Sequence, residues 1–223
     1  MISTFRKIAC EANYMSWDMS GNVFATHCVP IRSVVKKTRI RNAINDLPAG
    51  TAILFEDETE VTLFPPLRSG WTKRGAPAEV VISGGNAKRV VFGSLSLTGH
   101  RLLLVRRHQR AVDFQAFLRH VHQHHRGHPV CMLLDGDSSH TAAGSEDLAT
   151  DLGISLEWLP VRSPELNAIE DLWGDAKDAV CANHQYPDIE TQTDAFVEHL
   201  ESHTNHRAKK IAGLLSDDYW LFR

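Results

Sequence analysis

The feature that most constrains the fold is a pair of short apolar runs separated by a segment of helical character. The first run is Val130–Leu134 and the second covers residues 154–159. A strand, a helix and a strand in succession favour two parallel strands with a helical crossover, because parallel neighbours need a long connection. The first run stops at Asp135, Gly136 and Asp137. The sequence therefore predicts that acidic side chains lie at the end of a buried parallel strand.

The rest of the chain predicts an α/β fold, with a mixed sheet that has helices on both sides. Residues 51–55 are β-branched and apolar, which predicts a buried strand ending in Glu56, Asp57 and Glu58. Alternation places Ile53, Phe55 and Asp57 on one face and Leu54, Glu56 and Glu58 on the other. Further strands are expected at 61–64, 79–83, 89–97 and 101–107. Helices are expected over 112–125, 141–152, 164–182 and 190–203, with Ser163 as the N-cap of the third.

Composition sets only broad limits on function. The 223 residues are 43% hydrophobic and 23% charged, which is typical of an ordinary globular protein. No apolar run approaches the roughly 20 residues of a membrane span, and the N-terminus lacks the apolar core of a signal peptide, so we expect a cytoplasmic protein. The four cysteines form no CxxC pair, and we expect free thiols. The net charge of -3 does not exclude a nucleic-acid partner, since acids at a metal site can mask basic patches.

Residues 1–49 differ from the rest because their apolar residues follow no sustained period. This segment carries a basic run: Arg32, Lys36, Lys37, Arg39 and Arg41. Two interpretations stay open. The segment is either an arm that lies along a phosphate backbone or a solvated face of a short helix ended by Pro48. No helix-turn-helix pattern is recognisable in it.

Three acids from separate predicted elements are candidates for a shared site: Asp57, Asp135 and Glu170. If the two strands are parallel neighbours, their carboxyl ends meet at the edge where open α/β sheets bind ligands. Converging carboxylates suit Mg²⁺ or Mn²⁺ rather than zinc, and two such ions can assist both the attacking and the leaving oxygen of a phosphodiester. The alternative is that these acids belong only to turns and surfaces. Each has a neighbouring acid that competes for the assignment: Glu56, Glu58, Asp137 and Asp171.

Four motifs carry a resemblance to a known family: LFEDET, LFPPLRSGW, LLDGDSSH and LPVRSPELNAIEDLW. Over about residues 50–205 they resemble the catalytic domain of the mariner-type superfamily of DDE transposases, in its bacterial insertion-sequence branch. The 34 residues (136–169) between Asp135 and Glu170 match the interval typical of this branch. The resemblance implies a ribonuclease-H-like fold, in which a mixed five-stranded sheet is flanked by helices. It also implies that Asp57, Asp135 and Glu170 are the catalytic residues and hold two Mg²⁺ or Mn²⁺ ions per site.

The resemblance further implies a DNA transposase subunit that cleaves DNA and transfers strands, with insertion at a TA dinucleotide. The expected partners are DNA, a second copy of the chain on paired DNA ends and a separate helix-turn-helix subunit, with no membrane. The location would then be cytoplasmic and nucleoid-associated. The alternatives are a stand-alone ribonuclease-H-like DNA nuclease and a domesticated, non-catalytic DNA-binding remnant. We expect a basic arm or linker over 1–49, the catalytic domain over 50–205 and a C-terminal tail over 206–223.

The sequence departs from the family at a few points. Gly136 stands where the family usually has Asn, and Ala168 where it commonly has Pro. Neither departure removes a ligand. Asp137 either adds charge beside Asp135 or caps the turn, and we favour the cap. Family members usually begin with one or two helix-turn-helix modules, whereas about 50 residues precede the matched region here. A fragment, one half of a split reading frame and a domesticated nuclease are all compatible with that arrangement.

Other residues are candidates for supporting roles. The proposed phosphate contacts are Lys36, Lys37, Lys73, Arg74, Arg106, Arg107 and His140. His140 has two alternatives, which are to position Asp135 or to cap the following helix. Trp173 is expected to pack in the core and to keep its helix at the right rotation about its own axis. Asn167 either orients Glu170 by a hydrogen bond or faces solvent. Trp71 either stacks on a base or packs under its loop, which we favour. His120, His124 and His128 have a spacing that can bind zinc, but no thiolate or carboxylate lies near them in the sequence.

Overall fold

The structure is a computed structural model that describes residues 16–17, 23–24 and 31–222, except 72, 76–78 and 83. Within the first 34 residues only the backbone is described. Two short strands there, β1 (Ser16–Trp17) and β2 (Val23–Phe24), pair antiparallel. Cys10, Cys28 and the side chain of Arg32 lie outside the described residues. Cys131 and Cys181 are buried free thiols, as expected.

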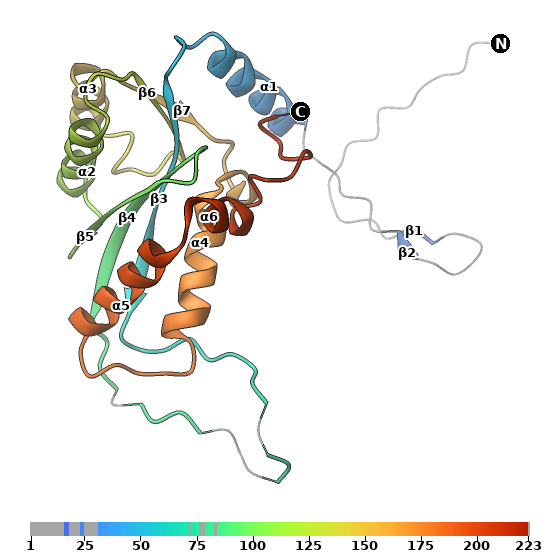
Figure 1. The fold of residues 1–223 in the computed structure, drawn as a ribbon, viewed down its shortest axis with the longest axis vertical. Helices are drawn as coiled ribbons and strands as arrows, with labels where there is room; N and C mark the ends of the chain where they lie inside the picture. Colours follow the sequence, from blue (N-terminus) through green and yellow to red (C-terminus); the bar gives the residue numbers. More distant parts are fainter. Residues whose placement is uncertain are drawn as a thin grey trace.

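The central sheet has five strands, which confirms the predicted mixed sheet. They are β3 (Ala52–Thr62), β4 (Lys88–Ser96), β5 (Arg101–Arg106), β6 (Val130–Leu134) and β7 (Ile154–Trp158). Their spatial order is β5-β4-β3-β6-β7 (Figure 1). The β3–β4 and β4–β5 pairs are antiparallel, whereas β3–β6 and β6–β7 are parallel. The parallel β6–β7 pair thus comes from the strand–helix–strand unit that the sequence predicts.

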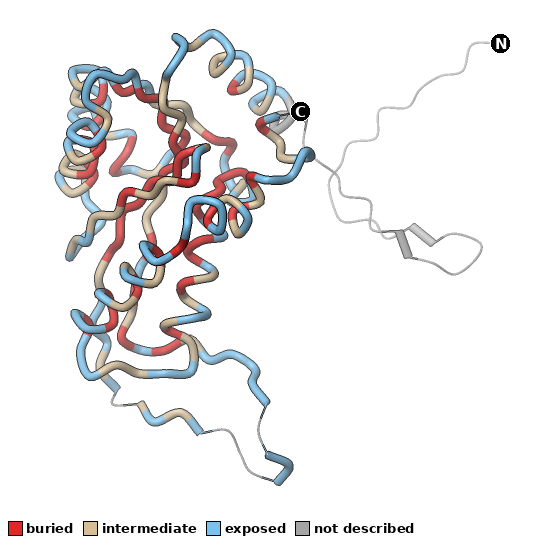
Figure 2. Tube along the Cα trace, viewed as in Figure 1, coloured by how far each residue is buried: buried red, intermediate tan, exposed pale blue. Residues whose placement is uncertain are grey.

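Helices cover both faces of the sheet. One face packs against α2 (Ala111–His124) and α3 (Ala143–Asp151). The other packs against α4 (Ile169–Ala176), α5 (Ile189–Ser202) and α6 (Asn205–Ile211), with part of α1 (Ile31–Asn45). Buried residues run through the sheet between these layers (Figure 2).

Alternation along β3 divides the apolar residues into two cores, as predicted. Phe55 belongs to the first core, beneath α4, α5 and α6. Leu54 belongs to the second core, beneath α2 and α3. On β6, Leu133 and Met132 divide in the same way between the first and second cores.

The prediction of separate strands at 51–55 and 61–64 is wrong. β3 is one strand that continues through Glu56, Asp57 and Glu58. Pairing with β4 is unbroken along this stretch, so ladder hydrogen bonds outweigh the low strand propensity of the acids. Asp57 therefore lies within the strand and not at its end. The strand predicted at 79–83 is also absent, since the described residues 79–82 are irregular and Val81 is 90% exposed.

The single helix predicted over 164–182 is three pieces. A 3₁₀ turn at Pro164–Leu166 precedes α4, and a π-helical turn follows at Lys177–Cys181. Extended backbone at Asn167 separates the first two pieces, and Ser163 makes no side-chain cap. The break has a tertiary cause, because the Asn167 side chain donates to the Glu56 carbonyl of β3 at 2.7 Å. The α-helical part of this segment, α4, thus begins just after the residue that binds the sheet.

Described residues of the segment 206–223, which we expected to be a tail, pack into the first core. The segment contains part of α6, and Leu214 and Leu221 are buried in the same cluster as Phe55. Tyr219 Oη and Trp220 Nε1 both donate to the Leu166 carbonyl, at 3.3 and 3.0 Å. Within the described part of the chain, no helix combines the length and apolar character that crossing a bilayer requires.

Candidate active site

Sheet register brings Asp57 and Asp135 together. Phe55 pairs with Leu133 across the parallel β3–β6 contact. Asp57 and Asp135 each lie two residues further along, on the side of the first core. β6 ends at Leu134, so Asp135 is the first residue beyond it, and its side chain is 62% exposed. The two acids therefore lie side by side at the level where β6 ends, although β3 continues past Asp57.

Glu170 lies in the first turn of α4, over the same face of the sheet. Its helix begins at a fixed point, because Asn167 is buried and holds the backbone of Glu56. The Glu170 backbone N–H donates to the Asn167 carbonyl at 3.1 Å. Asn167 thus positions the start of α4 by binding β3, a role that neither of the predicted alternatives described.

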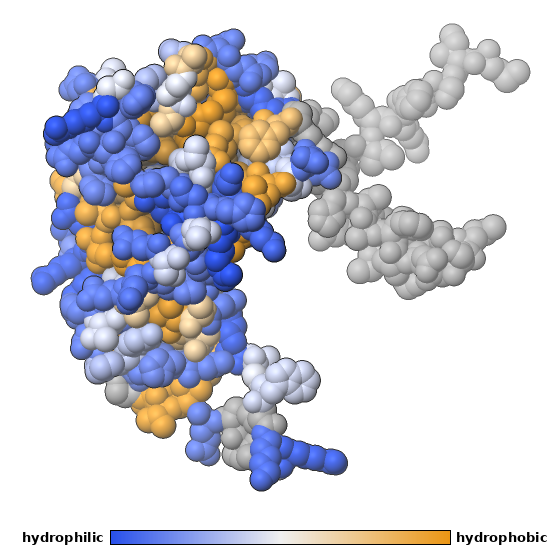
Figure 3. All heavy atoms as spheres, viewed as in Figure 1, coloured by the Kyte–Doolittle hydropathy of each residue, from blue (hydrophilic) through white to orange (hydrophobic). Residues whose placement is uncertain are grey.

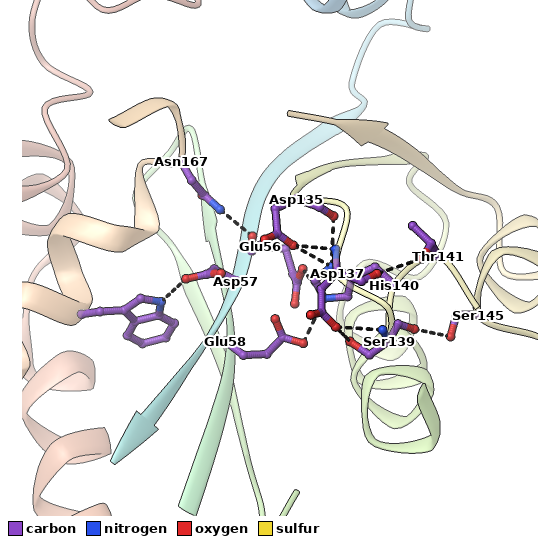
Figure 4. Close-up of polar contacts among 11 residues, drawn as sticks. Glu56, Asp57, Glu58, Asp135, Asp137, Ser139, His140, Thr141, Ser145 and Asn167 are labelled. Atoms are coloured by element: carbon purple, nitrogen blue, oxygen red, sulfur yellow. Dashed lines mark hydrogen bonds and ion pairs between the residues drawn. The ribbon is translucent and has the colours of Figure 1, made fainter. Parts of the chain in front are cut away.

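Trp173 links α4 to Asp57 directly. Its indole is buried in the first core, as predicted, and its Nε1–H donates to Asp57 Oδ2 at 3.1 Å (Figure 4). The indole reaches Asp57 over Gly93, the residue that pairs with Asp57 on β4. A Cβ atom at Gly93 would lie 2.4 Å from Trp173 Cη2. The sequence alone did not reveal this hydrogen bond, and the isolated glycine in a strand was the signal that could have indicated it.

The three acids influence one another electrostatically. Burial, Glu170 and Glu58 raise the pKa of Asp57 to about 8, although the hydrogen bond from Trp173 lowers it. Burial also raises the pKa of Glu170, with Asp135 and Asp171 adding to the rise and Lys177 opposing it. This arrangement fits a divalent cation, because carboxylates that destabilise one another's charge are stabilised by a hard ion between them.

Asp137 caps the turn after β6, as we favoured. Its Oδ1 accepts from the backbone N–H and the hydroxyl of Ser139, both at 2.8 Å. The Asp137 backbone N–H donates to Asp135 Oδ1 at 3.0 Å. The side chain of Asp137 therefore shapes the turn, while its backbone orients Asp135.

His140 lies beneath the site and is fully buried. Its ring lies between Asp135, just beyond β6, and two acids of β3, Glu56 and Glu58. Its Nδ1 is 3.1 Å from the Asp135 carbonyl and 3.2 Å from Asp135 Oδ1, and its Nε2 is 2.9 Å from Glu58 Oε1 (Figure 4). Nε2 also lies 3.6 Å from Glu56 Oε2. The prediction of a phosphate contact is not supported, because the ring has no exposed surface. Helix capping is also excluded, since the N-cap of α3 is Ala142.

The acids around His140 stabilise its positive charge in the protein interior. Burial opposes the imidazolium, but Glu56, Asp135 and Glu58 raise the pKa of His140 to about 12. Burial and Glu58 raise the pKa of Glu56, whose side-chain oxygens have no hydrogen-bond partner. The hydrogen bond from His140 holds the pKa of Asp135 below its usual value. Asp135 is therefore the acid of the three that is most readily ionised.

The predicted basic contacts lie mainly at the surface. Lys36, Lys73, Arg74 and Arg107 are exposed and Lys37 is half-buried. Arg106 is half-buried, with its Nε 3.9 Å from Asp113 Oδ1. Trp71 is fully exposed, so the expectation that it packs under its loop is wrong. This loop joins β3 to β4 and extends away from the sheet (Figure 1). Contact of these residues with DNA stays a prediction.

A family model described as "DDE superfamily endonuclease" matches residues 52–193, which is more than half of the chain. The chain belongs to this family. The matched range contains all three acids, the turn after β6 and the whole five-stranded sheet. It also contains Gly93, Asn167 and Trp173.

One relative of the chain is an insertion element IS630 uncharacterized 39 kDa protein from Shigella sonnei. It is 26% identical over 153 residues, which are 67% of this chain and 45% of the relative. The chain thus spans about half the length of that relative.

Among solved structures, the Mos1 mariner transposase catalytic domain matches with a TM-score of 0.60 and 16% identity, covering 88% of this chain and 94% of that one. A Mos1 paired-end complex with Mn matches with a TM-score of 0.65 and 15% identity, covering 97% and 64%. These likenesses establish the ribonuclease-H-like fold.

Asp57 has a consequence for stability that can be measured. Its pKa is about 8 in the folded protein against an ordinary value of 3.8, so the folded state binds more protons between about pH 4 and pH 8. We therefore expect the metal-free protein to lose stability as pH rises through this range. Thermal unfolding in EDTA should show a smaller loss for Asp57→Asn, and added Mg²⁺ should stabilise the wild type most at the alkaline end. Parallel curves for the two proteins would contradict this assignment.

Proposed function

We propose that this chain is the catalytic part of a DNA transposase, which cleaves phosphodiester bonds and transfers DNA strands. The observation that carries the proposal is the meeting of Asp57, Asp135 and Glu170 on one face of a ribonuclease-H-like sheet. Membership of the DDE family supports it. The Mos1 structures include a complex with a transposon end and a strand transfer complex, which supports DNA as the substrate.

The three acids would hold two divalent ions, Mg²⁺ or Mn²⁺. When bound, such ions activate the attacking oxygen and stabilise the leaving oxygen of a phosphodiester. The protein prepares each ligand differently. Trp173 fixes one oxygen of Asp57, and the turn after β6 fixes Asp135. Asn167 sets where the helix that carries Glu170 begins. Side chains held in this way lose little freedom when the site is filled, which favours productive geometry.

The DNA would contact Lys36 and Lys37 on α1, Arg106 and Arg107 at the end of β5, and basic residues of the β3–β4 connection. Lys73, Arg74 and the exposed Trp71 lie on that connection. Lysine and arginine can bind phosphates there, and the indole can stack on a base. The face drawn in Figure 3 is mostly hydrophilic, with its apolar residues in separate patches. These features suit a charged partner.

The wider assembly also belongs to this proposal. We propose that two copies of the chain act together on paired DNA ends, with insertion at TA. A separate helix-turn-helix subunit would recognise the ends, and the protein would associate with the nucleoid. The Mos1 paired-end complexes motivate the first of these statements.

A labelled duplex incubated with the protein and Mg²⁺ or Mn²⁺ tests the function. Products in which the labelled strand is joined to a second duplex support a transposase. Metal-dependent cleavage without joining supports the stand-alone nuclease instead. DNA binding without any metal-dependent product supports the non-catalytic remnant and overturns the proposal.

We propose that His140 is a positioning residue for Asp135. His140→Ala removes the donor that faces Asp135 and leaves Glu58 without its partner. We expect the metal concentration for half-maximal cleavage to rise roughly 10- to 100-fold, the usual cost of losing an outer hydrogen-bond partner. His140→Asn keeps a donor in reach of Asp135 and should restore part of this loss.

The exposed His128 offers a matched control for His140. His128→Ala should leave the metal dependence unchanged. If His140→Ala lowers the maximal rate and the melting temperature but not the apparent metal affinity, His140 only supports the fold.

A further inference from the structure

The two helices beside the active site carry a second group of metal-ligating side chains. Asp175 is on α4, and His199 is on α5, whose C-cap residue is His203. The Nε2 atoms of His199 and His203 lie 2.7 and 2.9 Å from the same oxygen, Asp175 Oδ2. The three ligand atoms all lie within 4.8 Å of one another. Three ligand atoms from two helices therefore converge on one point.

Local structure holds these ligands in place. His199 and His203 are four residues apart, a spacing that puts both side chains on one side of a helix. Their rings meet edge to face with centroids 4.7 Å apart. The His203 carbonyl accepts from Arg101 Nη2 at 2.5 Å, which ties the end of α5 to β5. The site is thus formed by packing that exists without an ion.

We propose that Asp175, His199 and His203 form a second metal site, which binds Zn²⁺ and clamps α4 to α5. Two imidazole nitrogens and one carboxylate oxygen are a typical zinc donor set, whereas Mg²⁺ prefers oxygen alone. Tetrahedral zinc with bonds of about 2.0–2.2 Å separates its ligand atoms by roughly 3.3 Å. The observed separations of 2.7 and 2.9 Å need to open by less than about 1 Å, as two N–H donors are replaced by the ion.

Exposure gives the ion a route to the site. The side chains of His199 and Asp175 are 24% and 26% exposed, while that of His203 is 5% exposed. An ion can therefore enter from solvent, and a water molecule can complete a fourth position. By contrast, the His140 cluster has no such route, because Glu56, Glu58 and His140 are almost fully buried. His120, His124 and His128 differ from His199 and His203 in another respect. Among the described residues, they do not belong to any group of three potential metal ligands that includes a carboxylate.

The position of the site gives it a consequence for α4. The same helix carries Glu170 and Trp173, and Trp173 stacks on Phe196 of α5 with ring centroids 6.2 Å apart. A metal clamp at Asp175 would hold the end of α4 opposite to Glu170. The site is independent of the proposed function, because none of its ligands belongs to the three acids.

Zinc titration of the full chain tests this site. Protein freed of metal with EDTA should bind one equivalent of Zn²⁺ tightly by calorimetry. An excess of Mg²⁺ should not displace it, and Co²⁺ should give the visible absorption of a tetrahedral complex. His199→Ala and Asp175→Asn should each weaken zinc binding by more than the roughly 10- to 100-fold that follows loss of an outer partner. Zinc should also raise the melting temperature of the wild type.

Matched controls separate the alternatives. His206→Ala changes an exposed histidine on neighbouring α6 and should leave zinc binding intact. Asp57→Asn should also leave it intact, which distinguishes this site from the three acids. If His203→Ala fails to fold, His199→Ala and Asp175→Asn carry the test. The proposal is overturned if the wild type binds no zinc, or if these two variants bind zinc as the wild type does.

Discussion

Asp135→Asn should reduce metal-dependent cleavage by roughly 10³-fold or more, the scale reached when one member of a cooperating catalytic group is removed. The substitution keeps the shape of the side chain and removes its charge. Asp135 is the acid whose pKa His140 lowers, so it supplies the most fully ionised ligand of the three. Single-turnover cleavage of a labelled duplex at saturating Mn²⁺ measures the effect without a contribution from product release.

Asp137→Asn is the matched control for this loss. An Asn side chain can still accept from the Ser139 N–H, so the turn after β6 should persist. Its backbone N–H to Asp135 is unchanged by the substitution. We expect a far smaller loss of cleavage than for Asp135→Asn. Equal losses in the two variants would mean that the charge of the whole turn matters and that Asp135 is not a specific ligand.

Gly93→Ala should destabilise the protein by about 1–3 kcal/mol, the usual cost of overpacking a core. The added Cβ would lie 2.4 and 2.7 Å from two ring atoms of Trp173 and 3.0 Å from Ile169 Cδ1. Trp173 would have to move, and its hydrogen bond to Asp57 would break. Thermal unfolding should therefore show a melting temperature lower by roughly 2–12 °C, and cleavage should fall as well.

A double-mutant cycle tests the cause of this effect. Trp173→Phe makes room above residue 93, so Gly93→Ala should cost less stability in that background. Gly174→Ala is the control, because a Cβ there meets nothing within 4 Å and lies on an exposed part of α4. It should be neutral or slightly stabilising. Additive losses for Gly93→Ala and Trp173→Phe would show that the indole does not require the glycine.

Elements with a local signal were predicted closely. The apolar run that forms β6 has the predicted bounds, and α2 begins and ends one residue before its prediction. The periodicity of α2 reflects burial of Phe114, Phe117, Leu118 and Val121 on one face. The predictions failed where a distant partner decides the structure. β3 continues through three acids because β4 pairs with it, and α4 begins after Asn167 because that side chain binds β3.

Two pairs of histidines with the same spacing show why the sequence alone does not specify a complete metal site. The histidines of α2 have a helical repeat that suggests zinc, yet among the described residues none of them belongs to a group of three potential metal ligands. His199 and His203 have the same repeat, and Asp175 reaches them only because α4 and α5 pack together. Spacing within one helix specifies two ligands, and the third depends on which helix lies opposite.

The sequence by itself singled out the three acids as candidates and determined the face of β3 to which Asp57 belongs, because motifs and side-chain alternation are local. Tertiary structure alone decided what surrounds Asp135 and Asp57. His140 meets Glu58, 82 positions away, and Trp173 meets Asp57, 116 positions away. The physical reason is that such contacts depend on strand register and on the packing of a helix over a glycine. Asp135 follows a buried strand in the sequence, and in the structure a buried histidine and the turn after the strand orient it.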